Sequence, residues 1–448
     1  MTRIVRKKFK RISLWVFCLI IIASCDNSSE HYEAETETAT SLFECDADNG
    51  GLTLPSGFCA GVIADSLGFI RHLAVNERGD IYVALRNTRL GLGGIMALSD
   101  SDEDGRIDQI EKFTDIPGLE IQLHGGSLYF ASENAIFRYE LTNESLLPEP
   151  SPEKVVGDFP EQDLHGGKAF AIDNMNNIYV NVGSISNACQ EEEQVAGSPG
   201  LDPCPELDNH AGIWRFSLDR VNQVPGQDGE HYAIGIRNTY AIDWHPVYDK
   251  LYAVQHGRDQ LHELWPDIYS AEQGAQLPAE ELLEINDSLS YGWPYCYYDK
   301  RLEKRVLAPE YGGNGMLIGR CENYPEPLVA FPAHYGPNDM VFYTATQFPR
   351  HYQNGAFIAF HGSYDRGPFE QVGYQIVFVP FTNGTVSGNW EVFADGFAGD
   401  GHVRFPEDAE YRPTGVAVGP DGSLYVTDSV QGRVWRIIYR DSEAASRK

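Results

Sequence analysis

The chain has 448 residues, a formal net charge of −31 and eight cysteines. So acidic a chain repels the phosphate backbone of nucleic acids, which argues against duplex binding, whereas it suits cations such as calcium. The 44 glycines, 25 prolines and 12% aromatic residues are typical of many short strands joined by turns.

Residues 1–24 have the pattern of a secretory signal. Their start is basic, and the apolar stretch 12–24 is too short for a stable membrane anchor. The end of this stretch, Ile22-Ala23-Ser24-Cys25, resembles a bacterial lipobox, so we expect Cys25 to become a lipidated N-terminus. Residues 25–43 are polar and acidic and predict a disordered tether. These features predict a bacterial cell-envelope protein that is held at the membrane by its lipid alone and faces the periplasm.

One pattern recurs through residues 44–440: an alternating strand, a polar turn, and a second strand rich in Tyr, Val and Ile. Copies spaced tens of residues apart are typical of a β-propeller, in which each copy forms the inner part of a four-stranded blade. The copies are 72–85, 124–141, 168–183, 241–257, 340–362 and 415–439. Six copies predict an all-β, six-bladed β-propeller over residues 44–440, followed by a short tail at 441–448.

Helix signals are sparse in this chain. Residues 278–286 (PAEELLEIN) predict one short helix. The segments 190–210, 260–290 and 298–320 fit none of the strand copies, so we expect them to be long loops on the faces of the propeller.

Six cysteines remain after Cys18 leaves with the signal and Cys25 takes the lipid. An even number in an exported chain argues for disulfides, and local pairing is the simplest of the possible arrangements. Metal binding is the alternative, but the chain has no Cys-x-x-Cys motif and no Cys/His ladder. The predicted pairs are Cys45–Cys59, Cys189–Cys204 and Cys296–Cys321.

Residues 100–111 (DSDEDGRIDQIE) have the spacing of a calcium-binding loop. Hard oxygen ligands at alternating positions can surround one cation, and Gly105 permits the sharp turn. No flanking helices are evident, so the segment predicts a structural site and not a sensor; an acidic surface turn is the alternative. The expected ligands are Asp100, Asp102, Asp104, the Arg106 carbonyl, Asp108 and Glu111.

The segment DLHGGK (163–168) precedes the strand at 168–183. A histidine before two glycines can lie exposed at a strand entrance, and a neutral histidine is the natural base near neutral pH. This makes His165 a candidate catalytic base, with a structural histidine as the alternative.

Arg237 and Asn238 precede the strand 240–244, and His256, Gly257 and Arg258 follow its partner strand. Residues at strand ends are where a rigid sheet displays chemistry. The alternative interpretation is that Arg237 is a surface arginine paired with a carboxylate.

Further cations and histidines precede or follow other strands. Arg71 and Arg412 each precede an inner strand, and His334 and His361 lie near strand ends. In a propeller such positions converge at one end of the central channel. Several cations at one channel mouth in an acidic protein suggest a polyanionic ligand.

These segments, together with YGWP (291–294), AHYGPNDMVFYTATQFP (333–349) and RPTGVAVGPDGSLYVTD (412–428), resemble one known family. It is the glucose/sorbosone dehydrogenase family, six-bladed propellers that use pyrroloquinoline quinone (PQQ) and calcium, and the similarity is greatest to its sorbosone dehydrogenase-like branch. The resemblance extends over residues 54–439.

The resemblance implies PQQ- and calcium-dependent oxidation of an aldose or related sugar aldehyde. His165 matches the base that takes the hydroxyl proton while a hydride leaves the sugar's anomeric carbon. The carbonyls of Gly257 and Arg258 match the backbone ligands of the cofactor's calcium. The expected partners are a small-molecule sugar and an unidentified electron acceptor. The expected cofactor-binding residues are Arg237, Asn238, Arg412, Lys168, Arg71, His334 and His256.

Two other functions remain open at this point. A non-catalytic lipoprotein propeller could bind a glycan or a protein partner, since propellers support many functions. A metal-dependent lactone hydrolase would need Glu, Asp or Asn ligands at the inner strand starts. Those starts carry Arg and His here, which disfavours the hydrolase.

The lipobox generates the first testable prediction. Cys25→Ser should move the protein from the membrane fraction to the soluble fraction, because the acylated side chain is removed. Cys18→Ser is the control, since Cys18 leaves with the signal. Membrane partition of Cys25→Ser equal to that of the control would contradict the lipid anchor.

Overall fold

The computed structural model describes residues 43–87, 92–142 and 144–440. The predicted signal, the lipidated Cys25, most of the tether and the tail lie outside these residues. Phe43, expected as the last residue of the tether, is instead buried in the propeller, where it packs with Ile63 and Leu67.

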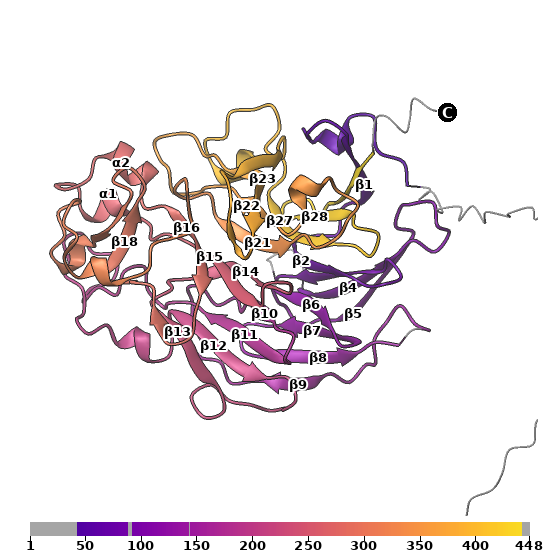
Figure 1. The fold of residues 1–448 in the computed structure, drawn as a ribbon, viewed down its shortest axis with the longest axis horizontal. Helices are drawn as coiled ribbons and strands as arrows, with labels where there is room; N and C mark the ends of the chain where they lie inside the picture. Colours follow the sequence, from indigo (N-terminus) through magenta and orange to yellow (C-terminus); the bar gives the residue numbers. More distant parts are fainter. Residues whose placement is uncertain (1–42, 88–91, 143, 441–448) are drawn as a thin grey trace, which may run out of the picture. The chain divides into compact units, whose positions relative to one another are not determined.

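The described chain forms six β-sheets arranged as the blades of a propeller, as predicted (Figure 1). Blade 1 consists of β2 (Ile70–Val75), β3 (Ile81–Leu85), β4 (Gly94–Ser99) and β5 (Gln109–Thr114). Blade 2 consists of β6 (Ile121–His124), β7 (Ser127–Ala131), β8 (Ile136–Glu140) and β9 (Glu153–Val156). Blade 3 consists of β10 (Phe170–Ile172), β11 (Asn177–Val182), β12 (Gly212–Ser217) and β13 (Glu230–Ile234), to which β17 (Leu289–Ser290) adds in parallel.

The remaining blades follow the same antiparallel order. Blade 4 consists of β14 (Thr239–His245), β15 (Lys250–Gln255), β16 (Glu280–Ile285) and β20 (Val329–Phe331). Blade 5 consists of β21 (Pro337–Phe342), β22 (Ala356–His361), β23 (Tyr374–Val379) and β26 (Glu391–Ala394). Blade 6 consists of β27 (Pro413–Val418), β28 (Leu424–Asp428), β29 (Val434–Tyr439) and, from the other end of the chain, β1 (Phe58–Ala64).

The pairing of β1 with β29 closes the ring. Phe58 lies opposite Tyr439 in the register. The Phe58 ring packs edge-on against Phe348, Tyr352 and Phe393, with centroids 4.8 to 5.2 Å apart. An unpaired β29 would leave an open sheet edge, which is an aggregation hazard that a closed ring avoids.

Hydrogen bonds between neighbouring blades fix the inner strands relative to one another. The Asp243 carboxylate accepts from the Phe342 N–H at 2.9 Å, and Asp339 accepts from the Val416 N–H at 2.8 Å. The Thr427 hydroxyl donates to the Arg71 carbonyl at 2.6 Å across the closing blade. The starts of the inner strands therefore keep fixed positions around the channel.

The predicted helix at 278–286 is wrong, because β16 occupies this segment between β15 and β20. Its glutamates favour a helix locally, but tertiary contacts decide the conformation. The Glu281 side chain is buried against the Arg305 guanidinium, and Glu280 accepts from the Gly257 N–H at 2.9 Å. The predicted loop at 260–290 therefore contains a strand of blade 4.

The second predicted strand copy, 124–141, is displaced outward by one strand. Residues of that copy form β7 and β8, the second and third strands of blade 2, while the innermost strand is β6. β6 has only four residues and is followed by Gly125 and Gly126, which both have a left-handed φ. Its alternation of buried and exposed side chains is therefore too short to detect in the sequence.

The remaining inserts carry short elements on one side of the propeller (Figure 1). These are α1 (Leu261–Leu264), α2 (Ala271–Gln276), β18 (Cys296–Asp299) and β19 (Lys304–Leu307). Within the described ranges, no helix is long and apolar enough to cross a membrane.

The structure contains the three predicted disulfides, Cys45–Cys59, Cys189–Cys204 and Cys296–Cys321. The first joins the start of the fold to β1, and the third joins β18 to a turn at Gly319–Asn323. Each closes a short loop and contributes roughly 2–4 kcal/mol to the free energy of unfolding.

The acidic segment 100–111 assembles only part of the expected calcium loop. The carboxylate oxygens of Asp100, Asp102 and Asp104 lie within 4.8 Å of one another. Asp108 instead accepts from the N–H and hydroxyl of Ser101, both at 2.7 Å. Glu111 lies within β5, where its carboxylate accepts from the Gln109 amide at 2.6 Å.

Arg106 also has another role than the one expected from the sequence. Its guanidinium bonds the Asp46 carboxylate at 2.7 Å and the Val62 carbonyl, so it ties the acidic segment to the start of the fold. Of the expected calcium ligands, the described structure therefore brings together the side chains of Asp100, Asp102 and Asp104. The carboxylates of Asp108 and Glu111 have protein partners instead.

These three aspartates generate a testable prediction. Calcium should raise Tm in the wild type and raise it less in Asp104→Ala, because the ion would relieve repulsion among the carboxylates. Glu103→Ala in the same turn is the matched control. An equal calcium-dependent rise in Tm for all three proteins would rule out this site.

Candidate active site

A cavity lies where the inner strands of several blades begin, and it has two adjacent lobes. The arginine lobe, about 220 Å³, is lined by Arg71, Arg86, Arg237 and Arg412 among others. The side lobe, about 370 Å³, extends over the turns of blades 1 to 3. The lining residues shared by both lobes are Arg71, Arg86, His165 and Tyr240.

His165 stands between the two lobes in a left-handed conformation, with φ 54°. Its Nδ1 lies 2.9 Å from the Ser184 carbonyl, which can only accept, so Nδ1 carries the hydrogen and Nε2 keeps its lone pair. Burial, and next the Arg237 charge, lower the pKa of His165 to about 3. The imidazole is therefore neutral at neutral pH, and the lone pair on Nε2 is free to accept a proton.

Gln162 and Lys168 hold the turn that carries His165. The Gln162 amide donates to the carbonyls of Leu164 at 2.7 Å and His165 at 3.0 Å. The Lys168 ammonium donates to the Gly166 carbonyl at 2.6 Å. Lys168 is fully buried and lines neither lobe, in contrast to the expected cofactor contact. Its place in the structure is beneath the turn.

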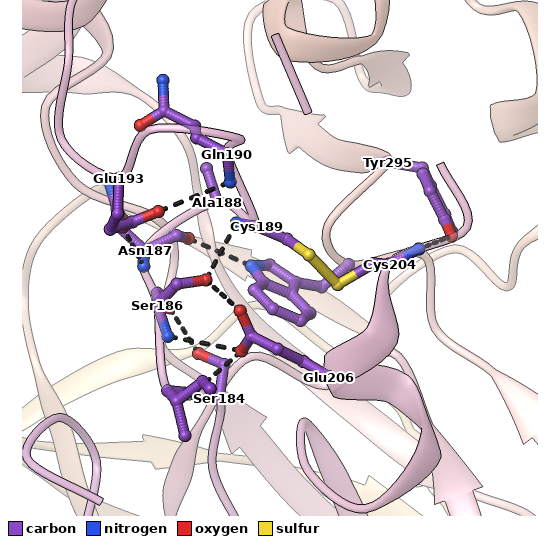
Figure 2. The surroundings of a disulfide bond; sticks show 12 residues. Ser184, Ser186, Asn187, Ala188, Cys189, Gln190, Glu193, Cys204, Glu206 and Tyr295 are labelled. Carbon is purple, nitrogen blue, oxygen red and sulfur yellow. Dashed lines mark hydrogen bonds between the residues drawn. A yellow bond between two sulfur atoms is a disulfide. The ribbon is translucent and has the colours of Figure 1, made fainter. Parts of the chain in front are cut away.

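The loop between β11 and β12 contains Ser184 and the Cys189–Cys204 disulfide (Figure 2), and Ser184 bonds His165 from the other side. Cys189–Cys204 closes this loop, and the Glu206 carboxylate accepts from the N–H of Ile185 at 2.8 Å and of Ser186 at 3.3 Å. These bonds fix the backbone that presents the Ser184 carbonyl. Gly183 has no room for a side chain, since a Cβ there would lie 2.5 Å from the Cβ of His165.

Asn187 of the same loop connects it to Arg237. Asn187 Oδ1 accepts from the Arg237 guanidinium at 3.1 Å and from the Asp259 N–H at 2.9 Å (Figure 2 shows Asn187 in the loop). Arg237 also donates to the Gly257 carbonyl at 2.9 Å. One loop therefore positions both the candidate base and the arginine predicted from the sequence.

Arg237 lines the arginine lobe, but its charge is already paired. The guanidinium is buried and lies 2.8 Å from an Asp259 carboxylate oxygen. Burial would raise the pKa of Asp259, but the Arg237 charge and the His334 hydrogen bond hold it far below its usual range. Arg237 is therefore paired with a carboxylate, as in the alternative interpretation, but it is buried and not at the surface.

The expected histidines of the arginine lobe differ in charge. His334 donates from Nε2 to the Gly274 carbonyl at 2.9 Å. Burial lowers the pKa of His334, but Asp259, 3.5 Å from Nδ1, outweighs this effect and raises it to about 9. Burial and the Arg237 charge lower the pKa of His256 to about 4. His334 is therefore a cation and His256 is neutral.

Asn238 and Arg412 also line the arginine lobe, as expected. Asn238 Oδ1 accepts from the Asn181 amide at 2.9 Å, which fixes the orientation of its side chain. The Arg412 guanidinium donates to two neutral carbonyls, those of His361 at 3.0 Å and Gly362 at 3.1 Å. These bonds orient the guanidinium and leave its charge uncompensated.

Three arginines of the cavity have no carboxylate partner among the described residues: Arg71, Arg86 and Arg412. Arg71 is only 9% exposed, and its guanidinium has no hydrogen bond or ion pair within the described ranges. Burial, then the charges of Arg86 and Arg412, lower the pKa of Arg71 to about 10. Burial of the Arg71 cation without a carboxylate partner is costly, and an anion bound in the cavity would offset this cost.

The arginine lobe also has oxygen atoms that could bind a cation. Gly257, Asp259 and Glu280 line it, and burial raises the pKa of Glu280 to about 7. Arg258 lines neither lobe; its guanidinium is buried in an ion pair with Glu310 at 2.5 Å. Of the two expected calcium-ligating residues, the structure therefore places only Gly257 at the cavity.

Several lining residues were not predicted from the sequence. Arg86 and Tyr240 belong to the inner hairpins of blades 1 and 4, and their position at a strand end is the signal that could have revealed them. Asp259 directly follows the predicted Gly257-Arg258 pair. Glu280 was not predicted as a cavity residue because the sequence of its segment, which forms β16, favours a helix.

The family model described as TrAA12-like matches residues 52–440. An uncharacterised protein of Borreliella burgdorferi is 26% identical over 279 residues, or 62% of this chain and 61% of that protein. A pyrroloquinoline quinone-dependent sugar dehydrogenase of Hypocrea jecorina is 22% identical over 272 residues, or 55% of this chain and 58% of that protein. The chain thus spans about three fifths of the length of the curated relatives it matches.

Solved structures show the same fold. The holo form of the PQQ domain of pyranose dehydrogenase from Coprinopsis cinerea has a TM-score of 0.68 at 19% identity, with 86% of this chain and 97% of that chain covered. The calcium structure of the Trichoderma reesei family AA12 enzyme has a TM-score of 0.68 at 20% identity, with 87% and 97% covered. Because the family model extends over nearly the whole propeller, this chain belongs to the TrAA12-like family.

Proposed function

We propose that this protein is a PQQ- and calcium-dependent dehydrogenase that oxidises an aldose or related sugar aldehyde at its anomeric carbon. The observation that carries the proposal is the set of unpaired arginines beside a neutral His165. The names of the Hypocrea jecorina relative and of the Coprinopsis cinerea structure, both PQQ proteins, support it.

The arginine lobe fits PQQ because this cofactor carries three carboxylates. Arg71, Arg86 and Arg412 offer charge-assisted hydrogen bonds that no described carboxylate uses. Arg237 and His334 both pair with Asp259, whose single negative charge weakens the attraction that each of these cations offers to a ligand. We therefore expect Arg71 and Arg412 to supply more of the binding free energy than Arg237.

The same lobe offers hard oxygen atoms suited to calcium: the Gly257 carbonyl and the carboxylates of Asp259 and Glu280. The Gly257 carbonyl already accepts from Arg237, but a carbonyl oxygen has a second lone pair. The calcium structure of the Trichoderma reesei enzyme supports the choice of ion.

His165 performs the acid–base chemistry in this proposal. Its Nε2 takes the proton of the sugar's anomeric hydroxyl, and the Ser184 carbonyl stabilises the imidazolium that forms by accepting from Nδ1. PQQ, when bound, supplies the quinone that accepts the hydride from the anomeric carbon. An aldose thereby loses one proton and one hydride and becomes a lactone.

A non-catalytic propeller that binds a glycan or a protein partner is the remaining alternative. Saturable PQQ binding in the presence of calcium distinguishes the two. For localisation, we propose the cell envelope, with the protein anchored by lipid at Cys25 and facing the periplasm; the lipobox in the sequence supports this.

The unpaired arginines generate a prediction about cofactor affinity. Arg71→Ala and Arg412→Ala should each raise the Kd for PQQ about tenfold to a hundredfold, since each removes a charged hydrogen-bond donor. Titration calorimetry with calcium present measures this. Arg138→Ala, on the outer part of blade 2 with Glu153, is the control. Absence of saturable PQQ binding by the wild type would end the dehydrogenase proposal.

The neutral histidine generates a prediction about turnover. His165→Ala should lower kcat about 10²–10⁴-fold, because the base is lost, while the Kd for PQQ stays close to that of the wild type. Dye reduction by a panel of sugars measures the first quantity and calorimetry the second. His351→Ala, at an exposed ion pair with Glu391, is the control. Wild-type turnover in His165→Ala would assign the base to another residue.

A further inference from the structure

We propose that the propeller holds a further metal site, formed by His72, Glu120 and Asp339, which takes one first-row divalent cation such as zinc. His72 lies in β2, Glu120 directly precedes β6, and Asp339 lies in β21, so the site joins the inner strands of blades 1, 2 and 5. None of these three side chains lines the arginine lobe or the side lobe. The site is therefore separate from the proposed cofactor cavity and does not depend on it.

The three side chains bring their ligand atoms close together. His72 Nδ1 lies 3.0 Å from Glu120 Oε2 and 3.9 Å from Asp339 Oδ1. One ligand atom of each residue lies within 4.8 Å of the other two. Four ligands around a zinc ion, with bonds of about 2.0–2.2 Å, stand about 3.4 Å apart. The observed separations lie on either side of this value, so small side-chain movements would close the three ligands around an ion.

The hydrogen bonds of His72 fix which nitrogen faces the carboxylates. Nε2 lies 2.7 Å from the Asn338 carbonyl, which can only accept, so Nε2 carries a hydrogen. The ring is fully buried, and burial lowers the pKa of His72, so the imidazole is neutral and Nδ1 has a lone pair. This lone pair faces the Glu120 oxygen. Two acceptors so close repel each other unless a proton or a metal ion lies between them.

The charge of the cluster favours a metal ion over a proton. Glu120 and Asp339 are only 3% and 6% exposed, and within the described ranges no Lys or Arg forms an ion pair with either carboxylate. Asp243 adds a third carboxylate to the cavity of about 240 Å³ that both residues line. Burying carboxylates without counter-charges is costly. One proton neutralises one carboxylate, whereas a divalent cation compensates two.

The set of donor atoms points to a first-row metal. An imidazole nitrogen with two carboxylates suits zinc, whereas calcium prefers oxygen ligands alone. The hydrogen bond from His72 Nε2 to a backbone carbonyl is the usual way in which metal-binding histidines are oriented. The Ile121 N–H donates to the other Glu120 oxygen, Oε1, at 3.1 Å and leaves Oε2 for the ion.

A bound ion would also stabilise the strand starts that carry the arginine lobe. Arg71 and Asn338, which directly precede two of the three ligands, both line that lobe. The Asp339 oxygen Oδ2 accepts from the Val416 N–H of blade 6 at 2.8 Å. The ion therefore links blades 1, 2 and 5 directly, and blade 6 through Asp339.

The test uses purified full-length protein that has been treated with EDTA and contains no PQQ. Zinc, manganese and calcium are titrated separately, with calorimetry for Kd and elemental analysis for the number of bound ions. The wild type should bind one more zinc ion than Glu120→Gln or His72→Gln, because each substitution removes a ligand. His124→Gln, at the end of β6, is the matched control and should keep this ion.

Glu120→Gln separates loss of the metal from loss of the fold. Its amide can donate to His72 Nδ1, so the hydrogen-bond partner stays while the metal ligand is lost. The Tm of Glu120→Gln in EDTA should therefore equal or exceed that of the wild type. Zinc should raise the Tm of the wild type and of His124→Gln by more than that of Glu120→Gln.

Two results would overturn the site. An equal number of zinc ions on the wild type, Glu120→Gln and His72→Gln would leave only a proton between His72 and Glu120. A tighter Kd for calcium than for zinc, at the ion that Glu120→Gln loses, would overturn the choice of metal. Because the samples contain no PQQ, either result leaves the dehydrogenase proposal standing, and failure of PQQ to bind leaves the metal site standing.

Discussion

Closure of the ring by β1 and β29 is the constraint on which the cavity depends. Several blades contribute groups to the arginine lobe, including Arg71 from blade 1, His165 before blade 3 and Arg412 before blade 6. Arg71 and Arg412 lie on opposite sides of the closing seam, where Thr427 bonds the Arg71 carbonyl. Without the seam these two guanidinium groups would have no fixed separation, and a rigid polyanion could not contact both.

The cavity contains charged side chains that form ion pairs and arginines that have no carboxylate partner, and the two groups have different roles. Arg237 and His334 both pair with Asp259, and these ion pairs hold the three side chains in position in the arginine lobe. Arg71 and Arg412 lack such partners and are available to an anionic ligand. Burying cations without counter-charges costs stability, and a bound anion would recover that cost.

A different set of contacts holds the candidate base, His165, in position. The Gln162 amide and the Lys168 ammonium hold the turn from one side, and the disulfide-closed loop presents the Ser184 carbonyl from the other. The left-handed backbone of His165 is thereby stabilised, and its tautomer is fixed with Nε2 free. Lys168 thus affects the site through the backbone of the turn.

The sequence by itself determined the six-bladed propeller, the three disulfide pairs and several residues of the arginine lobe, because alternation, the even number of cysteines and strand-end position can be recognised locally. Only the tertiary structure decided that β16 is a strand, since burial of Glu280 and Glu281 between neighbouring strands overrides helix propensity. It also decided which cations are paired: Asp259 pairs with Arg237, while Arg71 has no carboxylate partner within the described ranges and lies over the Tyr240 ring. Charge pairing depends on distances between blades, and these exist only once the ring has closed.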